Sequence, residues 1–355
     1  MSQKKVYIEF LRIVACFLVI VNHTNSRIFL SFSSTPPPPV WFASLTYFFI
    51  SKIAVPLFLM IMGAILLGKQ DTPQKSKRRL LRAFLILTAA SAAYYVYYAH
   101  RNAQPIQINV FLDQLFRLHA TNAFWYLYLY LGLLCLLPVL QKLVKVLSKQ
   151  ELQWLIFLSM GIMGLVPLIR IFAPDVSISG SFMMAFFSPC VGVVLCGYYI
   201  EHYMVINRKK AFLSCIIFVV LIVFQVLGTY DLFIRDSTNY LGLDNRDFIT
   251  ITGSAACFYM ISKYIFSRVQ LNTRVEKAIC SIGGLTFGIY LLGDWMIQIN
   301  PSVWIDSFLC RHMPAMPAMV LWEMFIFTAC AVLVAFFKKL LSYISRLCPS
   351  NWRLL

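Results

Sequence analysis

Apolar runs of about 20 residues recur from one end of the chain to the other, the length that an α-helix needs to cross the hydrocarbon core of a bilayer. Hydrophobic residues make up 60% of the 355 residues and charged residues only 13%. Such a composition leaves too little polar surface to cover a soluble fold. The sequence therefore predicts an all-α fold, a polytopic transmembrane helical bundle with the lipid bilayer as its surroundings.

The connections between the apolar runs alternate in charge. "MSQKK", "GKQDTPQKSKRRLLR" and "FFKKLLSYISRL" are rich in Lys and Arg, whereas "SFSSTPPPPVW", with its stiff extended "TPPPP", and "INPSVWIDSF" are poor in them. Because cytoplasmic loops carry the excess of basic residues, both termini are expected in the cytoplasm, which requires an even number of spans, about ten. The predicted spans are 7–29, 46–68, 80–99, 122–141, 152–172, 182–200, 211–229, 247–266, 278–298 and 317–341.

The formal net charge of +17 does not indicate a nucleic-acid partner, because the basic residues lie mainly in these connections and report membrane orientation. The ten cysteines lie mostly inside apolar runs and form no C-x-x-C pair, so no disulfide framework and no metal site are predicted. No connection is long enough to fold separately. Residues 1–355 are therefore expected to form a single transmembrane domain without a separate soluble one.

The first apolar run, "YIEFLRIVACFLVIVNHTNSR" (7–27), contains three ionisable groups that lipid disfavours. Arg12 and His23 are eleven positions apart, so they share a helix face about 16 Å apart along the axis, with Glu9 on the same face. Glu9 and Arg12 could form an ion pair at the lipid headgroups. His23 could be a satisfied core residue, but a polar group inside a span normally marks a pathway or a site. Its near-neutral pKa makes it a candidate general base.

This pattern, an acidic residue, Leu-Arg, and a histidine after ten intervening residues, resembles the first-helix signature of the acyltransferase 3 family. Four later segments are similar to family patterns and follow the family's order. Within the family, the chain resembles the branch that contains the O-acetyltransferase of enterobacterial common antigen. The four segments are "AVPLFLMIMGAIL" (54–66), "KRRLLRAF" (77–84), "FWYLYLYLGLLCLLPVL" (124–140) and "SIGGLTFGIYLLGDWMI" (281–297).

The resemblance implies an integral membrane enzyme that moves an acyl group, usually acetyl from acetyl-CoA, onto a cell-envelope glycan. Acyl-CoA is then a donor substrate, no cofactor is held, and the location is the inner membrane of a bacterial cell. His23 would be catalytic, and Arg79 and Arg82, with the deeper Arg12, would bind acyl-CoA; a basic run contacting anionic lipid is the alternative for Arg79 and Arg82. Supporting roles are expected for Glu9, Asn22, Trp125, Tyr290 and Asp294, although Asn22 points about 100° away from His23.

Three positions depart from the family pattern. Gly293 stands where a late histidine is expected, Ala123 where a histidine often opens the third of these segments, and Met62 where a serine commonly precedes the glycine of the first; His119 lies one helical turn before Ala123. The loss of the late histidine gives some weight to a second hypothesis, an exporter or flippase of a glycan or lipid-linked sugar.

Acyl transfer to a sugar hydroxyl needs a base for the hydroxyl proton and a group that stabilises the oxyanion. The sequence shows no Ser-His-Asp array and no G-x-S-x-G elbow, which favours direct transfer over an acyl-serine intermediate. A channel from Arg79 and Arg82, past Arg12, to His23 would bring a cytoplasmic thioester to an acceptor on the outer side.

Overall fold

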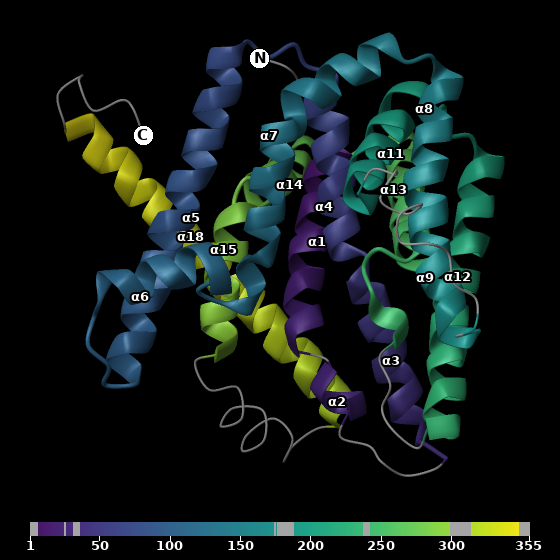
Figure 1. Cartoon of the computed structure of the whole chain (residues 1–355), viewed down its shortest axis with the longest axis horizontal. Coiled ribbons are helices and arrows are strands. Elements are labelled where there is room, and N and C mark those ends of the chain that lie inside the picture. The colour runs from purple at the N-terminus through teal and green to yellow at the C-terminus, as the bar shows by residue number, and fades with distance from the viewer. Residues whose placement is uncertain are drawn as a thin grey trace. The chain divides into compact units, whose positions relative to one another are not determined.

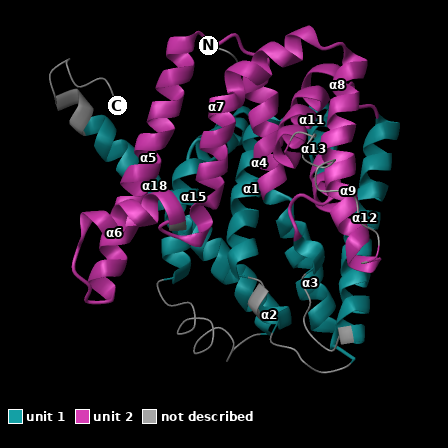
Figure 2. Cartoon of the chain, viewed as in Figure 1, with its two compact units in different colours: residues 1–54, 208–244, 257–355 teal, residues 55–207, 245–256 magenta. Residues whose placement is uncertain are grey.

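The computed structural model describes residues 6–24, 26–30, 36–173, 175, 188–236, 242–298 and 314–347, and these are helices joined by turns and short connections (Figure 1). The predicted all-α class is confirmed. The chain divides into two compact units, coloured separately in Figure 2. The first unit comprises residues 1–54, 208–244 and 257–355, and the second comprises residues 55–207 and 245–256. The single domain expected for residues 1–355 stays a prediction.

Helix α1 (Val6–Thr24) lies at the centre of the first unit. Leu11, Ala15 and Val21 of α1 are completely buried, which accounts for a mainly apolar sequence. The helices that contact α1 are α2 (Ser26–Leu30), α3 (Pro39–Lys52), α14 (Thr273–Gly283), α15 (Thr286–Gln298) and α18 (Ala315–Leu347). The unit also contains α12 (Arg208–Asp236), η5 (Gly242–Asp244) and residues 257–268 of α13 (Ile249–Arg268).

In the second unit, one short π-helical segment makes close contacts with two longer helices. The π-helix η1 (Gly63–Leu67), which continues α4 (Ala54–Met62), packs against α11 (Pro189–Tyr203) and α7 (Trp125–Val146). The long helix α5 (Pro73–Arg101) lies against α7. The remaining elements are α6 (Ile108–Asp113), η2 (Gln114–Leu118), η3 (Asn122–Phe124), α8 (Lys149–Ile156), η4 (Phe157–Ile162) and α9 (Met163–Phe172).

Among the described residues, eight helices are long and apolar enough to cross a membrane. Helices α14 and α15 form a ninth if the pair, bent by 55°, is one span. The predicted span 182–200 begins outside the described residues. Helix α11, which overlaps its described part and extends to Tyr203, has 15 residues, fewer than a span needs. The expected count of about ten and the cytoplasmic termini stay predictions.

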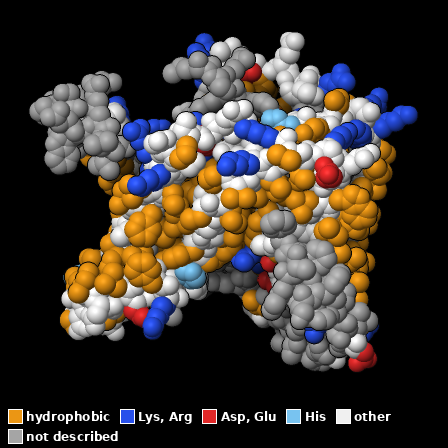
Figure 3. All heavy atoms as spheres, turned by 45° about the horizontal axis from the view of Figure 1, so that its top comes forward, with side chains coloured by type: hydrophobic (Ala, Val, Ile, Leu, Met, Phe, Trp, Pro, Cys, Tyr) orange, Lys and Arg blue, Asp and Glu red, His pale blue; other side chains and the backbone are white. Residues whose placement is uncertain are grey.

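Helix α12 presents large apolar side chains away from the protein interior. Phe212, Leu213, Val219 and Val220 are each at least 55% exposed. Water would penalise such a surface, whereas lipid does not. Figure 3 shows hydrophobic side chains over much of the face in view, with Lys and Arg side chains gathered along part of it. Together with the eight apolar helices, these surfaces indicate a multi-pass membrane protein.

Candidate functional site

Glu9 and Arg12 form an ion pair on α1, as the sequence allowed. Arg12 Nη1 donates a hydrogen bond to Glu9 Oε1 at 3.0 Å. The Arg12 side chain is 32% exposed, but that of Glu9 is only 6% exposed, so this is not an open surface pair. The second carboxylate oxygen of Glu9 is buried and has no hydrogen-bond partner within the described residues. Glu9 therefore orients Arg12 from inside the bundle.

The face of α1 that carries Glu9 lies against the junction of α14 and α15. A Cβ atom at Gly283 would stand 2.5 Å from Glu9 Oε2, so only glycine fits there without displacing the carboxylate. One turn after Arg12, Cys16 Sγ donates to the carbonyl oxygen of Thr286 at 3.3 Å. The late helix singled out in the sequence is thus seated directly on α1.

His23 lies in the last turn of α1 and is half-buried. Helix α1 packs against α15, which carries Asp294, and against α3, which ends at Lys52. Asp294 is 8% exposed, and its Oδ2 accepts a hydrogen bond from Gln298 Nε2 at 2.8 Å. The structure therefore packs together the helices that carry His23 and Asp294, two of the residues predicted from the sequence.

Lys52 was not predicted. Its Nζ lies 3.1 Å from Asp244 Oδ2 and 4.2 Å from the centre of the Phe48 ring, and the side chain is only 15% exposed. Its carboxylate and aromatic partners stabilise a cation that would otherwise be costly inside a span. Lys52 is a charged residue within the predicted span 46–68. The rule that pointed to Arg12 would therefore also have pointed to Lys52.

Glu323 of α18 was missed as well. It is completely buried, and it accepts hydrogen bonds from Thr24 Oγ1 at 2.6 Å and from Tyr47 Oη at 2.7 Å. Within the described residues no Lys, Arg or His forms an ion pair with it. Because Thr24 directly follows His23, Glu323 fixes the end of α1 that carries the candidate base. A glutamate inside the apolar run "VLWEMFIF" was the available signal.

Replacing Glu323 by alanine should lower thermal stability more than replacing it by glutamine. Alanine leaves the hydroxyls of Thr24 and Tyr47 without their acceptor, at about 1–3 kcal/mol for each unsatisfied buried group. Glutamine keeps one acceptor oxygen. Melting of the purified variants in one detergent measures the difference, with Glu276→Ala in the first turn of α14 as the control. Equal melting temperatures for Glu323→Ala and Glu276→Ala would contradict this assignment.

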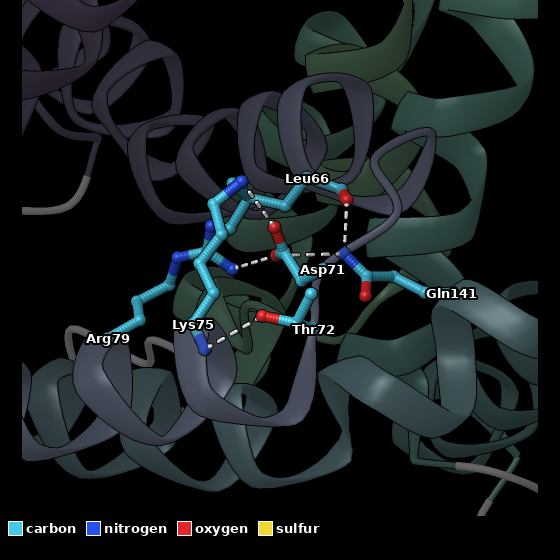
Figure 4. Close-up of polar contacts among 6 residues, drawn as sticks. All are labelled: Leu66, Asp71, Thr72, Lys75, Arg79 and Gln141. Atoms are coloured by element: carbon cyan, nitrogen blue, oxygen red, sulfur yellow. Dashed lines mark hydrogen bonds and ion pairs between the residues drawn. The ribbon is translucent and has the colours of Figure 1, made fainter.

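In the second unit, Asp71 gathers polar side chains from two helices (Figure 4). Its Oδ2 accepts hydrogen bonds from Arg79 Nη1 of α5 and, at 3.1 Å, from Gln141 Nε2 of α7. Lys75 Nζ lies 2.8 Å from its Oδ1. Arg79 is thus engaged and 22% exposed, whereas Arg82, one turn further along α5, is exposed. Asp71 and Gln141 were not singled out from the sequence.

Burial acts to raise the pKa of the Asp71 carboxyl, but the hydrogen bonds from Arg79, Lys75 and Gln141 lower it by more, so this pKa lies below its usual value. A group whose pKa is depressed on folding contributes stability above its unfolded-state pKa of about 3.9 and loses that contribution as the pH falls through the folded-state value. The Asp71 network therefore remains charged near neutral pH.

The other predicted positions have diverse surroundings. Trp125 is at the start of α7, and the guanidinium carbon of Arg246 lies 3.9 Å from the centre of its ring. Tyr290 is buried in α15, and Asn22 Oδ1 is buried without a hydrogen-bond partner in the described part of the chain. His119 is exposed and meets the Tyr128 ring edge to face, with the two ring centres 4.5 Å apart.

Arg12 and His23 belong to the first unit, and Arg79 and Arg82 to the second, so the channel expected to join them stays a prediction. Gly293, which stands where the resemblance predicts a late histidine, lies on the α1 side of α15. A Cβ there would be in ordinary contact with Ile20 at 3.8 Å. Within the described ranges, no three His, Cys, Asp or Glu side chains are arranged to hold a metal ion.

Comparison with known proteins identifies the family. No curated protein and no solved structure gives a significant match to the chain. The model of the acyltransferase 3 family, described as an acyltransferase domain, matches residues 5–341 and so covers every candidate residue above. Nearly the whole chain is matched, and the chain carries the apolar helices of a multi-pass protein; it therefore belongs to the acyltransferase 3 family of membrane acyltransferases.

Proposed function

We propose that this acyltransferase moves an acyl group, acetyl in the first place, from acyl-CoA to a hydroxyl of a cell-surface polysaccharide or lipid-linked glycan. It would act in the inner membrane of a bacterial cell, as in the enterobacterial common antigen branch that its sequence resembles. The observation that carries this proposal is the setting of His23, a half-buried imidazole at the end of α1, which packs against α15 with Asp294 and α3 with Lys52.

The chemistry follows from these three groups. The His23 imidazole accepts the proton of the acceptor hydroxyl while the hydroxyl oxygen attacks the thioester carbonyl carbon. The Lys52 ammonium stabilises the oxyanion that forms, and the Asp294 carboxylate stabilises the protonated imidazole. The new C–O bond forms, the C–S bond breaks, and the proton passes from His23 to the coenzyme sulfur. The products are the glycan ester and free CoA thiol.

The donor would be bound by Arg12, Arg79 and Arg82. Guanidinium groups match phosphate oxygens in geometry and stay charged at every relevant pH. Arg82 is exposed, and Arg79 and Arg12 are partly exposed, so each has N–H groups available for a ligand. Acyl-CoA is a substrate in this scheme, and no bound cofactor is needed.

The acceptor would be recognised by aromatic and charged side chains. Sugars stack on aromatic rings, and Trp125 offers an indole that Arg246 already covers on one face. Arg246 is 43% exposed and could donate hydrogen bonds to glycan oxygens. Tyr290 and Asn22 would support the surroundings of His23 from α15 and α1.

Binding of acetyl-CoA to the purified protein in nanodiscs tests the donor assignment. Arg79→Ala and Arg82→Ala are each expected to raise the Kd for acetyl-CoA by at least about 10-fold, because each removes charge-assisted hydrogen bonds to phosphate. Arg117→Ala is the control, since Arg117 is 79% exposed and paired with Asp113 in the same unit. Wild-type protein that neither binds acetyl-CoA nor releases CoA from it would contradict the proposed function.

A further inference from the structure

In the cluster of Asp71, Lys75 and Arg79, the carboxylate is buried and the two cationic side chains are partly exposed. The Asp71 side chain is completely buried, whereas those of Lys75 and Arg79 are 58% and 22% exposed. One negative and two positive charges leave a net charge of +1 on the cluster, so the carboxylate does not neutralise it. An approaching anion would meet ammonium and guanidinium groups and would not meet the carboxylate.

The carboxylate is itself held in place. Gln141 of α7 is 4% exposed, and its Nε2 donates to the Leu66 carbonyl oxygen at 2.8 Å as well as to Asp71 Oδ2 (Figure 4). Leu66 belongs to the π-helix η1, a distortion that is frequent at functional sites. Thr72, the next residue after Asp71, caps α5 by accepting a hydrogen bond from the Lys75 backbone N–H at 3.3 Å. Asp71 is thus fixed relative to α5 and α7.

A fixed carboxylate orients the arginine that it contacts. Only Nη1 of Arg79 bonds to Asp71, and the guanidinium has five N–H donors in a rigid fork. Holding this long side chain in one conformation removes rotamer entropy that a ligand would otherwise have to overcome. The Asp71 contact therefore prepares the remaining donors of Arg79 for a phosphate.

We infer that Asp71 is a positioning residue for the acyl donor, which orders Arg79 and Lys75 into a preformed site for a coenzyme phosphate. This inference rests on the proposed function, because it assigns the cluster to the same donor. A purely structural role, in which Asp71 only fastens α5 to α7, is the competing explanation. The two roles differ in how they affect donors with and without phosphates.

The experiment compares acetyl-CoA with S-acetyl-pantetheine, a thioester donor that carries no phosphate, using Asp71→Asn in nanodiscs. Positioning predicts that the ratio of kcat/KM for acetyl-CoA to kcat/KM for S-acetyl-pantetheine falls about 10-fold, mainly through KM for acetyl-CoA. Asp71→Glu keeps the negative charge that Asp71→Asn removes, so its kcat/KM ratio should lie between those of Asp71→Asn and the wild type. Asp113→Asn, in an exposed Asp113–Arg117 pair of the same unit, should leave the ratio at the wild-type value.

A ratio unchanged in Asp71→Asn, or an equal loss with both donors, would overturn the inference and leave the proposed function standing. Wild-type protein inactive with both donors would instead overturn the proposed function. If Asp71→Asn does not fold, Gln141→Ala serves in its place, since it frees the Asp71 carboxylate while keeping all three charges of the cluster. It should lower the same ratio, by a smaller factor, and an unchanged ratio there contradicts the inference.

Discussion

His23→Ala should reduce acyl transfer by about 10²–10⁴-fold, the usual contribution of a general base. Without the imidazole, the acceptor hydroxyl keeps its proton while its oxygen attacks the thioester, and the departing sulfur loses the proton that His23 would deliver. Binding of acetyl-CoA should change little, because the proposed donor contacts are arginines. Formation of labelled glycan ester by wild type and variant, at equal protein concentration, measures this loss.

His100→Ala is the matched control for His23. His100 is exposed in the last turn of α5, so the same substitution there should leave transfer at the wild-type rate. Melting temperatures of both variants separate a catalytic loss from unfolding. Transfer that persists in a folded His23→Ala protein would place the base elsewhere.

Gly63→Ala should prevent the second unit from folding correctly. A Cβ atom at Gly63 would collide with the Val194 backbone carbonyl of α11, closer than atoms can approach, and a backbone group cannot turn aside as a side chain can. Small residues allow helices in membranes to approach this closely. The expected result is little or no monodisperse protein after extraction, or a strongly lowered melting temperature.

Gly132→Ala provides the comparison for Gly63. Gly132 lies inside α7, and a Cβ there would meet nothing within 4 Å. Because glycine costs a helix interior about 0.5–1 kcal/mol relative to alanine, this variant should be as stable as wild type or slightly more so. A Gly63→Ala protein with wild-type yield and melting temperature would contradict the close packing of η1 on α11.

Features that depend on local sequence signals could be predicted for this molecule, whereas features that depend on long-range contacts could not. The all-α class and most membrane-length helices followed from apolar runs, which are local signals. The predicted span 80–99 lies within α5, and this helix begins earlier, at Pro73, with a basic, exposed segment. The extended "TPPPP" segment was expected, and Pro38 is extended, but Pro39 already occupies the first turn of α3, a position that proline favours.

The residues of the candidate site also divide into those that a local signal reveals and those that it does not. Intramembrane charge pointed to Glu9, Arg12 and His23, and applied without exception it would also have found Lys52 and Glu323. Asp71 could not have been found by that rule. It lies in a short polar connection where an acid beside lysines and arginines suggests a solvated surface, and its hydrogen-bond partner Gln141 is 70 positions away.

Transfer of an acyl group from acyl-CoA to a glycan yields two products, and an experiment that follows both together tests the proposed function. Wild-type protein in nanodiscs is given acetyl-labelled acetyl-CoA and a lipid-linked glycan, and CoA thiol and glycan ester are counted over time. We expect the two products to rise in equal amounts, each requiring His23. Glycan that crosses the membrane in proteoliposomes without consumption of acetyl-CoA, and with His23→Ala as competent as wild type, would contradict the proposed function and support export.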